Sequence, residues 1–108
     1  MITIDDFKKV EIKAGKIMSA EKVPETDKLL RLIVDFAEEN PRQIISGIAL
    51  HFPDASVLVG KTCTFITNLE PRMIKGLESN GMLLALSTDT EFSLLEPSTS
   101  IPAGTSAR

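Results

Sequence analysis

Apolar and polar residues alternate in short runs along most of the chain, and turn residues separate the runs. In the clearest run, residues 30–36, every even position is apolar, which is typical of a strand that buries one face. A polar turn at residues 38–41 follows, and a second apolar run, residues 42–49 with Gly47 inside it, comes next. The two runs predict a hairpin, with a close approach of the backbone at the glycine.

The run over residues 10–23 is longer and changes phase near its middle. Its apolar positions are even up to Ala14, whereas Ile17 and Val23 form the better inward set afterwards, so the alternation slips near Gly15 and Lys16. A slip of one residue at a glycine is typical of a β-bulge, which bends a strand so that it serves two parts of a curved sheet. With the slip counted, four charged side chains fall on the outer face: Glu11, Lys13, Lys16 and Lys22.

Two further strands are predicted at residues 63–67 and 82–86. The segment between them, residues 68–82, concentrates basic, amide, hydroxyl and glycine residues. Binding residues gather in loops that a rigid sheet holds in place, so we interpret this segment as a binding loop. The strand at 82–86 is apolar on both faces, and its outer face therefore needs cover. Either the terminal segments or a second subunit provide that cover.

Helical turns are predicted at two places. Pro53 and Gly60 bracket one or two turns between the third and fourth strands. Thr3 caps a short N-terminal turn whose buried side carries Ile4 and Phe7. The order of elements predicts an all-β OB-fold, a five-stranded barrel with a short helix between strands 3 and 4 and small N- and C-terminal extensions. The open face and the loops of such a barrel bind oligonucleotides or oligosaccharides.

Length and composition fit one globular domain that spans residues 1–108. Apolar residues make up 43% and charged residues 25% of the chain, a balance that argues against wholesale disorder. The sequence shows neither a secretory leader nor an apolar run of about 20 residues. We therefore expect a cytoplasmic protein with no membrane partner.

The net charge is −3, but it is unevenly distributed. Residues 8–31 hold seven bases and four acids, a local excess of 7 − 4 = +3, which leaves −6 for the rest. These bases form either a solvated face or a surface for phosphate, and three lysines on one face of a strand favour binding. The chain has no Trp or Tyr, and its five Phe residues occupy positions typical of a core. The chain therefore has few aromatic side chains on which single-stranded bases could stack. This favours recognition of a folded RNA by its backbone shape.

No set of residues predicts catalysis. Cys63, the only cysteine, lies in an apolar alternating segment without a neighbouring ligand, so we expect a buried thiol and no metal site. His51 is the only histidine and lies between a strand and a turn, with no spacing of the Ser-His-Asp kind around it. We therefore expect a binding protein that has no catalytic residues, metal or cofactor.

The most specific signal is a set of motifs in a fixed order, at residues 4–17, 27–30, 42–49, 68–72, 76–85 and 101–105. Together these motifs resemble the tRNA-binding domain found at the C-terminus of many methionyl-tRNA synthetases. Stand-alone tRNA-binding proteins, the endothelial-monocyte-activating polypeptide module and the CsaA-type chaperones are similar. The resemblance runs nearly from end to end of the chain.

The resemblance implies a non-catalytic module that binds tRNA as a structured object, usually as a homodimer, and assists an aminoacyl-tRNA synthetase. Three expected contacts have a structural alternative, since Asn68 can cap the turn, Ser79 can bond within the loop and Met82 can pack in the core. Glu70 stands where the family often has Lys, and its carboxylate weakens phosphate binding. The expected tRNA contacts are Lys13, Lys16, Lys28, Arg31, Asn68, Arg72, Lys75, Ser79 and Met82.

The alternative function is that of a CsaA-type chaperone, which holds extended polypeptide on the same barrel. The negative net charge, Glu70 and the flexible side chains of Met18, Met73 and Met82 favour it. The cationic strand argues against it. A scaffold role in a synthetase complex is the third possibility.

Overall fold

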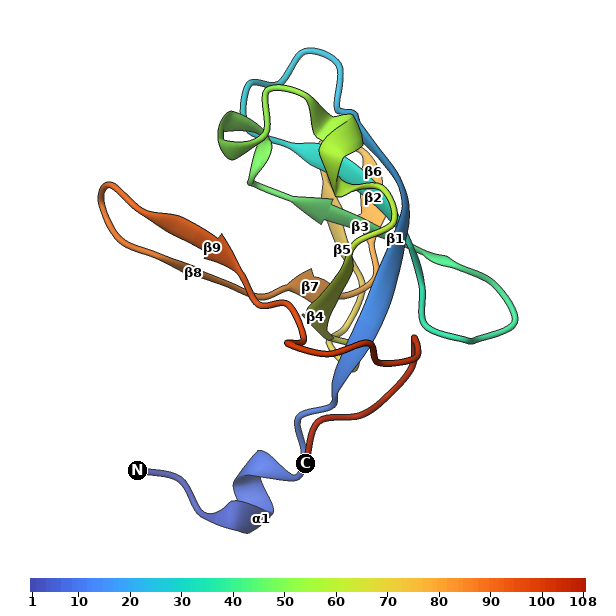
Figure 1. Cartoon of the computed structure of the whole chain (residues 1–108), viewed down its shortest axis with the longest axis vertical. Helices are drawn as coiled ribbons and strands as arrows, with labels where there is room; N and C mark the ends of the chain where they lie inside the picture. Colours follow the sequence, from blue (N-terminus) through green and yellow to red (C-terminus); the bar gives the residue numbers. More distant parts are fainter.

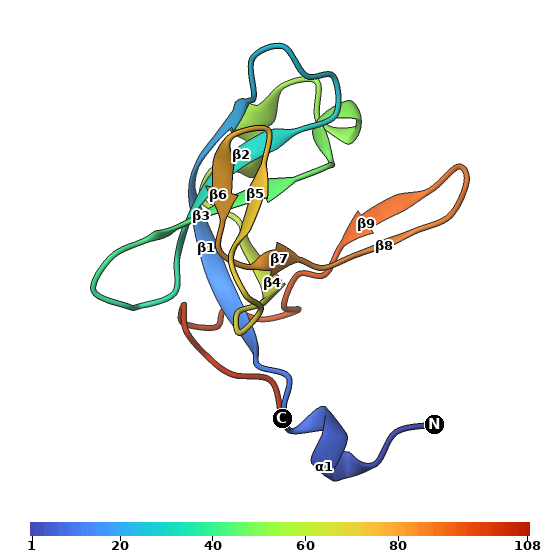
Figure 2. The same ribbon diagram turned by 180° about the vertical axis from the view of Figure 1, so that it is seen from behind.

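Antiparallel strands form one curved sheet that closes into a barrel (Figures 1 and 2). The computed structural model describes all residues from 1 to 108. The sheet has five strands in the order β3-β2-β1-β4-β7. Their bounds are Ile12–Lys22 for β1, Leu30–Asp35 for β2, Arg42–Ser46 for β3, Thr62–Ile66 for β4 and Met82–Leu83 for β7. This architecture confirms the predicted all-β barrel of the OB type.

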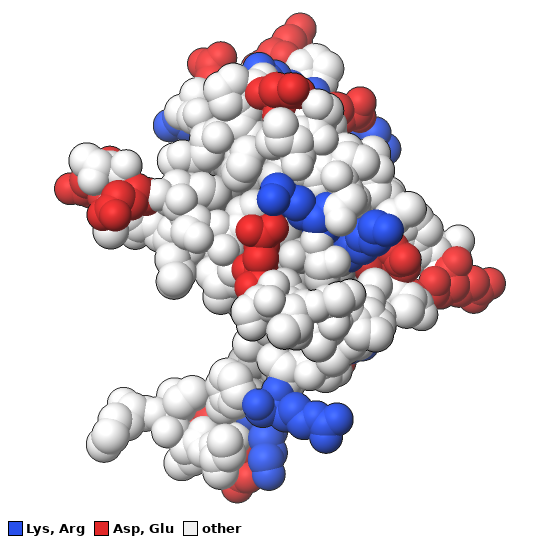
Figure 3. Space-filling model, in the orientation of Figure 1, with Lys and Arg blue, Asp and Glu red and all other residues white.

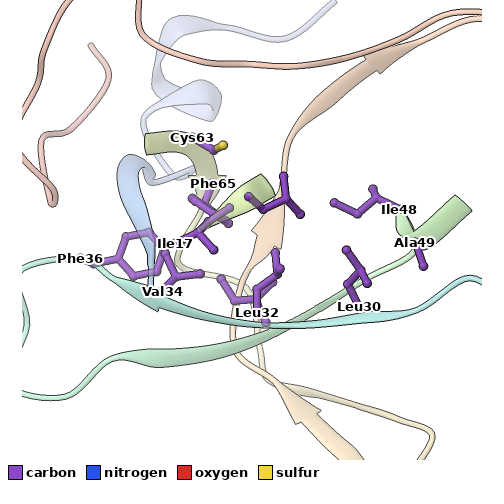
Figure 4. Packing of buried hydrophobic residues seen from close by; sticks show 11 residues of the cluster. Ile17, Leu30, Leu32, Val34, Phe36, Ile48, Ala49, Cys63 and Phe65 are labelled. Atoms are coloured by element: carbon purple, nitrogen blue, oxygen red, sulfur yellow. The ribbon is translucent and has the colours of Figure 1, made fainter. Parts of the chain in front are cut away.

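The barrel interior is filled by one apolar cluster (Figure 4). The alternation in β2 places Leu30, Leu32 and Val34 inside with no exposed surface, as the sequence predicts. The rings of Phe36 and Phe65 meet edge to face, with their centroids 5.2 Å apart. Cys63 lies in the same cluster, and burial raises the pKa of its thiol to about 11. The buried members are Ile17, Leu30, Leu32, Val34, Phe36, Ile44, Ile48, Ala49, Leu58, Cys63 and Phe65.

Strand β1 joins the two halves of the barrel, because its first part pairs with β4 and its second part with β2. The pairing with β2 skips Met18, so the predicted bulge exists, but its predicted position at Gly15 and Lys16 is wrong. Gly15 has a different role. A Cβ atom there would lie 2.5 Å from Cε1 of Phe36, so the glycine lets this ring pack directly against the strand.

The segment predicted as a loop at residues 68–82 contains a hairpin. Its strands are β5 (Arg72–Ile74) and β6 (Leu77–Ser79), which pair with each other and not with the main sheet. Lys75 and Gly76 form the turn with φ angles of 51° and 80°. Two consecutive positive φ angles are the backbone of a type I′ turn, which suits a tight hairpin. The glycine was visible in the sequence, but the strands around it are too short to give a clear alternation.

The end of this hairpin closes the barrel against β3. The main-chain N–H of Ile45 donates to Oγ of Ser79 over 3.0 Å, and the N–H of Asn80 donates to the carbonyl of Gln43 over 2.8 Å. Ser79 is 5% exposed, so the first of these bonds is shielded from water. A buried hydroxyl at the end of β6 and a main-chain hydrogen bond thus close the barrel together.

Two 3₁₀ turns, η1 (Ala49–His51) and η2 (Ala55–Leu58), connect β3 to β4. The second confirms the helical turn predicted here, and the Asp54 side chain caps it. The first makes β3 shorter than predicted. No atom lies within 4 Å of a Cβ placed on Gly47, so the predicted close approach of the backbone there is wrong. None of the helical segments has the length and apolarity needed to cross a membrane.

Two segments project from the barrel in different directions, one beyond the end where the chain termini lie and the other sideways (Figures 1 and 2). The first is α1 (Ile4–Phe7), which Thr3 caps as predicted, through a reciprocal pair of 3.1 Å hydrogen bonds with Asp6. The predicted burial of this turn is wrong, because Ile4 is 67% and Phe7 is 42% exposed. The turn lies away from the barrel and has no surface of this chain to pack against.

The second projecting segment is the hairpin of β8 (Ala85–Ser87) and β9 (Phe92–Leu94). The strand predicted at residues 82–86 is therefore divided between the barrel and this hairpin. The ring of His51 stacks on Phe92, with the centroids 4.0 Å apart and the planes 11° from parallel. This contact joins η1 to the projecting hairpin.

The C-terminal segment runs beside the first part of β1. The N–H of Gly104 donates to the carbonyl of Ala14, and the N–H of Ala107 donates to that of Ile12, each over 2.8 Å. These bonds occupy the edge of β1 that β2 does not reach. The C-terminal extension therefore completes the hydrogen bonding of the sheet.

Candidate nucleic-acid interface

A groove of about 620 Å³ lies between the loop that follows β1 and the β5–β6 hairpin. In OB-folds the loops at these positions line the surface that binds oligonucleotides. Leu29, Met73 and Ile74 form the apolar part of the lining. The polar lining residues are Glu25, Thr26, Asp27, Lys28, Arg72 and Lys75.

The loop side of the groove is fixed by hydrogen bonds of its own. The N–H of Val23 donates to the carbonyl of Leu29 over 3.1 Å, and the Thr26 hydroxyl donates to the carbonyl of Val23 over 2.8 Å. The carbonyl of Lys28 accepts the N–H of Ala49 over 3.0 Å, which ties the loop to η1. The backbone of this side is thus held in place while its charged side chains remain exposed.

The hairpin side is held by a row of hydrogen bonds across the outer face of the sheet. Nε2 of Gln43 on β3 donates to the carbonyl of Glu78 on β6 over 2.8 Å. Arg31 on β2 donates from Nε to Oε1 of Gln43 and from Nη1 to Glu21 on β1, both over 2.6 Å. Arg31 was predicted as a tRNA contact. The structure places it outside the groove lining, in a row that positions the hairpin.

The basic side chains divide into paired and unpaired groups. Five of the 12 lie within 4.0 Å of a carboxylate, namely Lys9, Lys13, Arg31, Arg42 and Lys61. The remaining seven are Lys8, Lys16, Lys22, Lys28, Arg72, Lys75 and Arg108. Three of these line the groove: Lys28, Arg72 and Lys75. The groove therefore brings together three cations that form no ion pair within 4.0 Å, beside the carboxylates of Glu25 and Asp27.

The surface as a whole carries mixed charge. Figure 3 shows basic side chains across the middle of the barrel, where acidic ones adjoin them, and a second basic group beside the chain ends. Lys13 is one of the paired cations, since its Nζ lies 3.6 Å from the Glu11 carboxylate and its side chain is 23% exposed. Lys16 is exposed and unpaired, but it does not line the groove. The two predicted contacts on β1 thus lie outside the groove.

Asn68 and Ser79 both use their side chains within the fold. Oδ1 of Asn68 accepts the N–H of Glu11 over 2.8 Å, and its Nδ2 donates to the carbonyl of Lys9 over 2.7 Å. Ser79 accepts the Ile45 N–H and donates to the Gly81 carbonyl over 3.3 Å. Both side chains make the bonds of the structural alternative, and of the two only Asn68 is exposed.

Met82, the last predicted contact, lies on the edge strand β7 and is 41% exposed. It does not line the groove. Met73 does line it and is 69% exposed, more than any other large apolar side chain except those of the first two residues. The sequence offered no signal for this difference, since each methionine lies close to a turn that contains one glycine.

Arg42 is the cation that sequence interpretation missed. Its Nε and Nη2 donate to the two Glu38 carboxylate oxygens over 2.8 and 2.7 Å, and Nη1 donates to the carbonyl of Thr67 over 2.6 Å. The guanidinium also lies 5.4 Å from the centroid of the Phe36 ring. The hydrogen bonds from Arg42 lower the pKa of Glu38. We call Glu11, Glu38, Arg42 and Thr67 the Arg42 clamp.

Glu11 completes the Arg42 clamp at the start of β1. Its Oε1 accepts the Thr67 hydroxyl over 2.6 Å, and this bond is the main cause that lowers the pKa of Glu11. The clamp therefore fastens the turn between β2 and β3 to the ends of β4 and β1. No group of three or more His, Cys, Asp or Glu side chains is placed to hold a metal ion.

The sequence matches a model of the family described as "Putative tRNA binding domain" over residues 12–106. It is 51% identical over 107 residues to the methionine–tRNA ligase of Methanospirillum hungatei, a match that covers 99% of this chain and 16% of that protein. The chain thus spans about a sixth of the length of the curated relatives it matches.

Solved structures share the fold over the whole chain. The MetRS-related protein of Pyrococcus horikoshii superposes with a TM-score of 0.91 at 36% identity, covering 100% of this chain and 98% of that one. The chaperone CsaA of Bacillus anthracis superposes with a TM-score of 0.88 at 25% identity, covering 100% and 99%. Both comparisons include the barrel and the two projecting segments.

Proposed function

We propose a function from one premise: this chain belongs to the tRNA-binding domain family, whose model covers residues 12–106. The function is non-catalytic binding of folded tRNA through its backbone and shape. The observation that carries it is the groove between the loop after β1 and the β5–β6 hairpin. Its cations Lys28, Arg72 and Lys75 have no carboxylate partner and lie where OB-folds bind oligonucleotides.

The charge of the groove sets the kind of binding. A net charge of −3 gives the protein no general attraction to RNA, so binding depends on this local group of cations. Each phosphate that a cation neutralises releases counterions and makes affinity salt-dependent. For three such contacts we expect log K to fall against log salt with a slope of about −2 to −3.

The setting we propose is that of an accessory to an aminoacyl-tRNA synthetase in the cytoplasm. The matched ligases support it, because this chain corresponds to a part of each that amounts to 16% of its length. The groove supplies contacts to the RNA and no group for the aminoacylation chemistry. In this setting the module raises the local concentration of tRNA near an active site that lies elsewhere.

We also propose that the chain acts as a homodimer. Both segments that project from the barrel carry exposed apolar residues, with Phe7 in α1 42% exposed and Leu86 in β8 67% exposed. Exposed apolar side chains on arms that lack cover within the chain suit burial against a second copy. Sedimentation velocity tests this, since Leu86→Asp should convert a dimer to a monomer.

Polypeptide binding remains the second candidate function. One observation favours it, namely the 69% exposure of Met73 in a groove that also contains Leu29 and Ile74. Flexible thioether side chains at an apolar surface adapt to varied partners. The 25% identity to a structure described as a CsaA chaperone points the same way.

Fluorescence anisotropy tests the two functions together. Labelled tRNA, a single-stranded RNA of equal length and an unfolded peptide are each titrated with the protein at several salt concentrations. We expect tight, salt-dependent binding that prefers folded tRNA. If the protein bound the peptide and did not bind tRNA, the tRNA-binding function would be wrong and the chaperone function would be favoured.

Reversing the charge of one groove residue tests whether tRNA binds at the groove. Arg72→Glu should abolish tRNA binding, because it replaces an unpaired groove cation with a repelling carboxylate. The matched control is Lys8→Glu, at another exposed and unpaired cation outside the groove lining. Equal losses in both variants would show that total charge matters and not the groove.

A further inference from the structure

The groove contains more than phosphate binding requires. Three of its lining residues, Leu29, Met73 and Ile74, are apolar and have nothing to offer a phosphate group. Met73 lies opposite Glu78 across the hairpin and leaves 69% of its surface to solvent. A surface that served only the charged backbone of RNA has no use for this apolar strip beside its cations.

The carboxylates of the groove also need a partner. Glu25 and Asp27 line it together with the cations, and neither forms an ion pair. A carboxylate repels phosphate, but it accepts hydrogen bonds from the exocyclic amino groups of nucleobases. The groove thus contains all three kinds of group that a nucleotide can contact: cations for phosphate, an apolar surface for the base, and acceptors for the base edge.

The groove is open to solvent and has the size of a small-ligand site. Its volume of about 620 Å³ lies within the range of sites that hold one small ligand. Proteins that recognise RNA by sequence contact bases that loops, bulges or ends leave unstacked. A single nucleotide that has left the stack fits both the volume and the lining.

We propose that the groove holds one unstacked nucleotide of the bound tRNA, a proposal that rests on the proposed function. Arg72 and Lys75 contact its phosphate, Met73 and Leu29 pack against the face of its base, and Asp27 accepts from an amino group on the base edge. The rest of the tRNA is bound by its backbone and shape. The site therefore adds a base contact to a binding mode that otherwise does not depend on sequence.

The four methionines of the chain allow a direct test. In protein labelled with ¹³C at the methionine methyl groups, the spectrum has one signal each for Met1, Met18, Met73 and Met82. A base packed on Met73 shifts its methyl signal upfield through the ring current. Saturating tRNA should therefore move the Met73 signal and leave that of Met18, which lies on β1 outside the groove, unchanged. Inorganic phosphate alone should move neither signal.

Each result decides the proposal. If tRNA binds by anisotropy but the Met73 signal does not shift, the nucleotide site is wrong and tRNA binding stands. If tRNA does not bind, both proposals fail. If the Met73 signal shifts with an unfolded peptide and not with tRNA, the groove is a peptide site and the nucleotide proposal is again overturned.

Substitutions give a second, independent test. Met73→Ala should weaken tRNA binding by about 3- to 10-fold with an unchanged salt slope, because an apolar contact releases no counterions. Met18→Ala is the matched control and should bind as the unmodified protein does. Equal affinity of the two variants contradicts the base contact.

Asp27→Ala tests the role of this carboxylate by the direction in which tRNA affinity changes. If the carboxylate accepts from the base, its removal weakens binding, by about tenfold for a good contact. If it merely repels phosphate, its removal strengthens binding. Tighter binding by this variant therefore overturns the assigned role of Asp27.

Discussion

The groove and the Arg42 clamp are both rich in charge, but their charges are arranged in opposite ways. In the clamp, Arg42 has 16% of its side chain exposed and gives its donors to Glu38 and to the carbonyl of Thr67. In the groove, Arg72 and Lys75 are exposed and have no carboxylate partner. One region uses its cations to hold the fold, and the other leaves them available to a ligand.

This difference shows that the number of bases in a segment does not locate a binding site. A cation that already donates to carboxylates must break those bonds before it contacts phosphate, whereas an unpaired exposed cation loses only water. Lys13 and Arg31 lie in the basic part of the sequence, yet both have carboxylate partners. Whether a charge has a partner is therefore more informative than where it lies in the sequence.

The largest effect is expected from breaking the clamp. Arg42→Ala removes the donors to Glu38 and leaves the carbonyl of Thr67, a residue 4% exposed, without this partner. We expect the free energy of unfolding to fall by about 2 kcal/mol. Urea denaturation measures it, with an unchanged m-value indicating that only stability has changed.

The control for that prediction comes from the groove. Arg72→Ala changes an exposed residue with no ion pair, so its free energy of unfolding should change by less than about 0.5 kcal/mol. If both variants lost the same stability, the contrast between a structural and an available cation would be wrong.

A smaller effect is expected at Asn68. Asn68→Ala removes the acceptor for the Glu11 N–H and the donor to the Lys9 carbonyl, so stability should fall by about 1 kcal/mol. Affinity for tRNA, measured below the unfolding transition, should stay within about twofold because the side chain already has partners in the fold. Weaker tRNA binding without loss of stability would instead make Asn68 a contact to the RNA.

The two classes of cation also differ in their expected effect on binding. Lys75→Ala should lower tRNA affinity by about fivefold and reduce the salt slope by roughly one unit, as the loss of one phosphate contact does. Lys13→Ala should change affinity by less than about twofold, because Glu11 lies 3.6 Å from its ammonium group. Equal changes in the salt slope would show that Lys13 leaves Glu11 and contacts the RNA.

Much of the fold was predictable because its main strands bury one face. The alternation over residues 30–36 specifies β2 and its place in the core. The bulge was misplaced because Gly15 is needed for the packing of Phe36, and sequence alone does not separate that role from a bulge. The β5–β6 hairpin was missed because strands of three residues each show too little alternation.

The sequence predicted several residues of the candidate site, but it did not predict which of them lie together. Lys28, Arg72 and Lys75 were expected as contacts and do line one groove. The partners of Arg31 and Asn68 are 10 to 59 residues away in sequence, so nothing local showed that these side chains are occupied. Met73 lines the groove and Met82 lies on the edge strand β7, because the chain folds back between them.

The smallest predicted effect is the response of the clamp to acid. Glu11 and Glu38 both have a pKa below the ordinary glutamate value of 4.5, because each accepts hydrogen bonds in the folded state. A carboxylate with a lowered pKa stabilises the fold above its unfolded pKa, and that contribution disappears as the pH falls through the folded pKa. The clamp should thus leave stability unchanged from pH 7 to about 5 and weaken the fold below about 4.5, by no more than about 1 kcal/mol for these exposed groups. Arg42→Ala should reduce this loss of stability at low pH, since Glu38 then loses the main cause of its low pKa. Arg72→Ala should lose stability at low pH as the unmodified protein does. Urea denaturation of the three proteins at pH 7, 5 and 3.5 compares them, and an equal loss in all three would mean that other carboxylates control the response to acid.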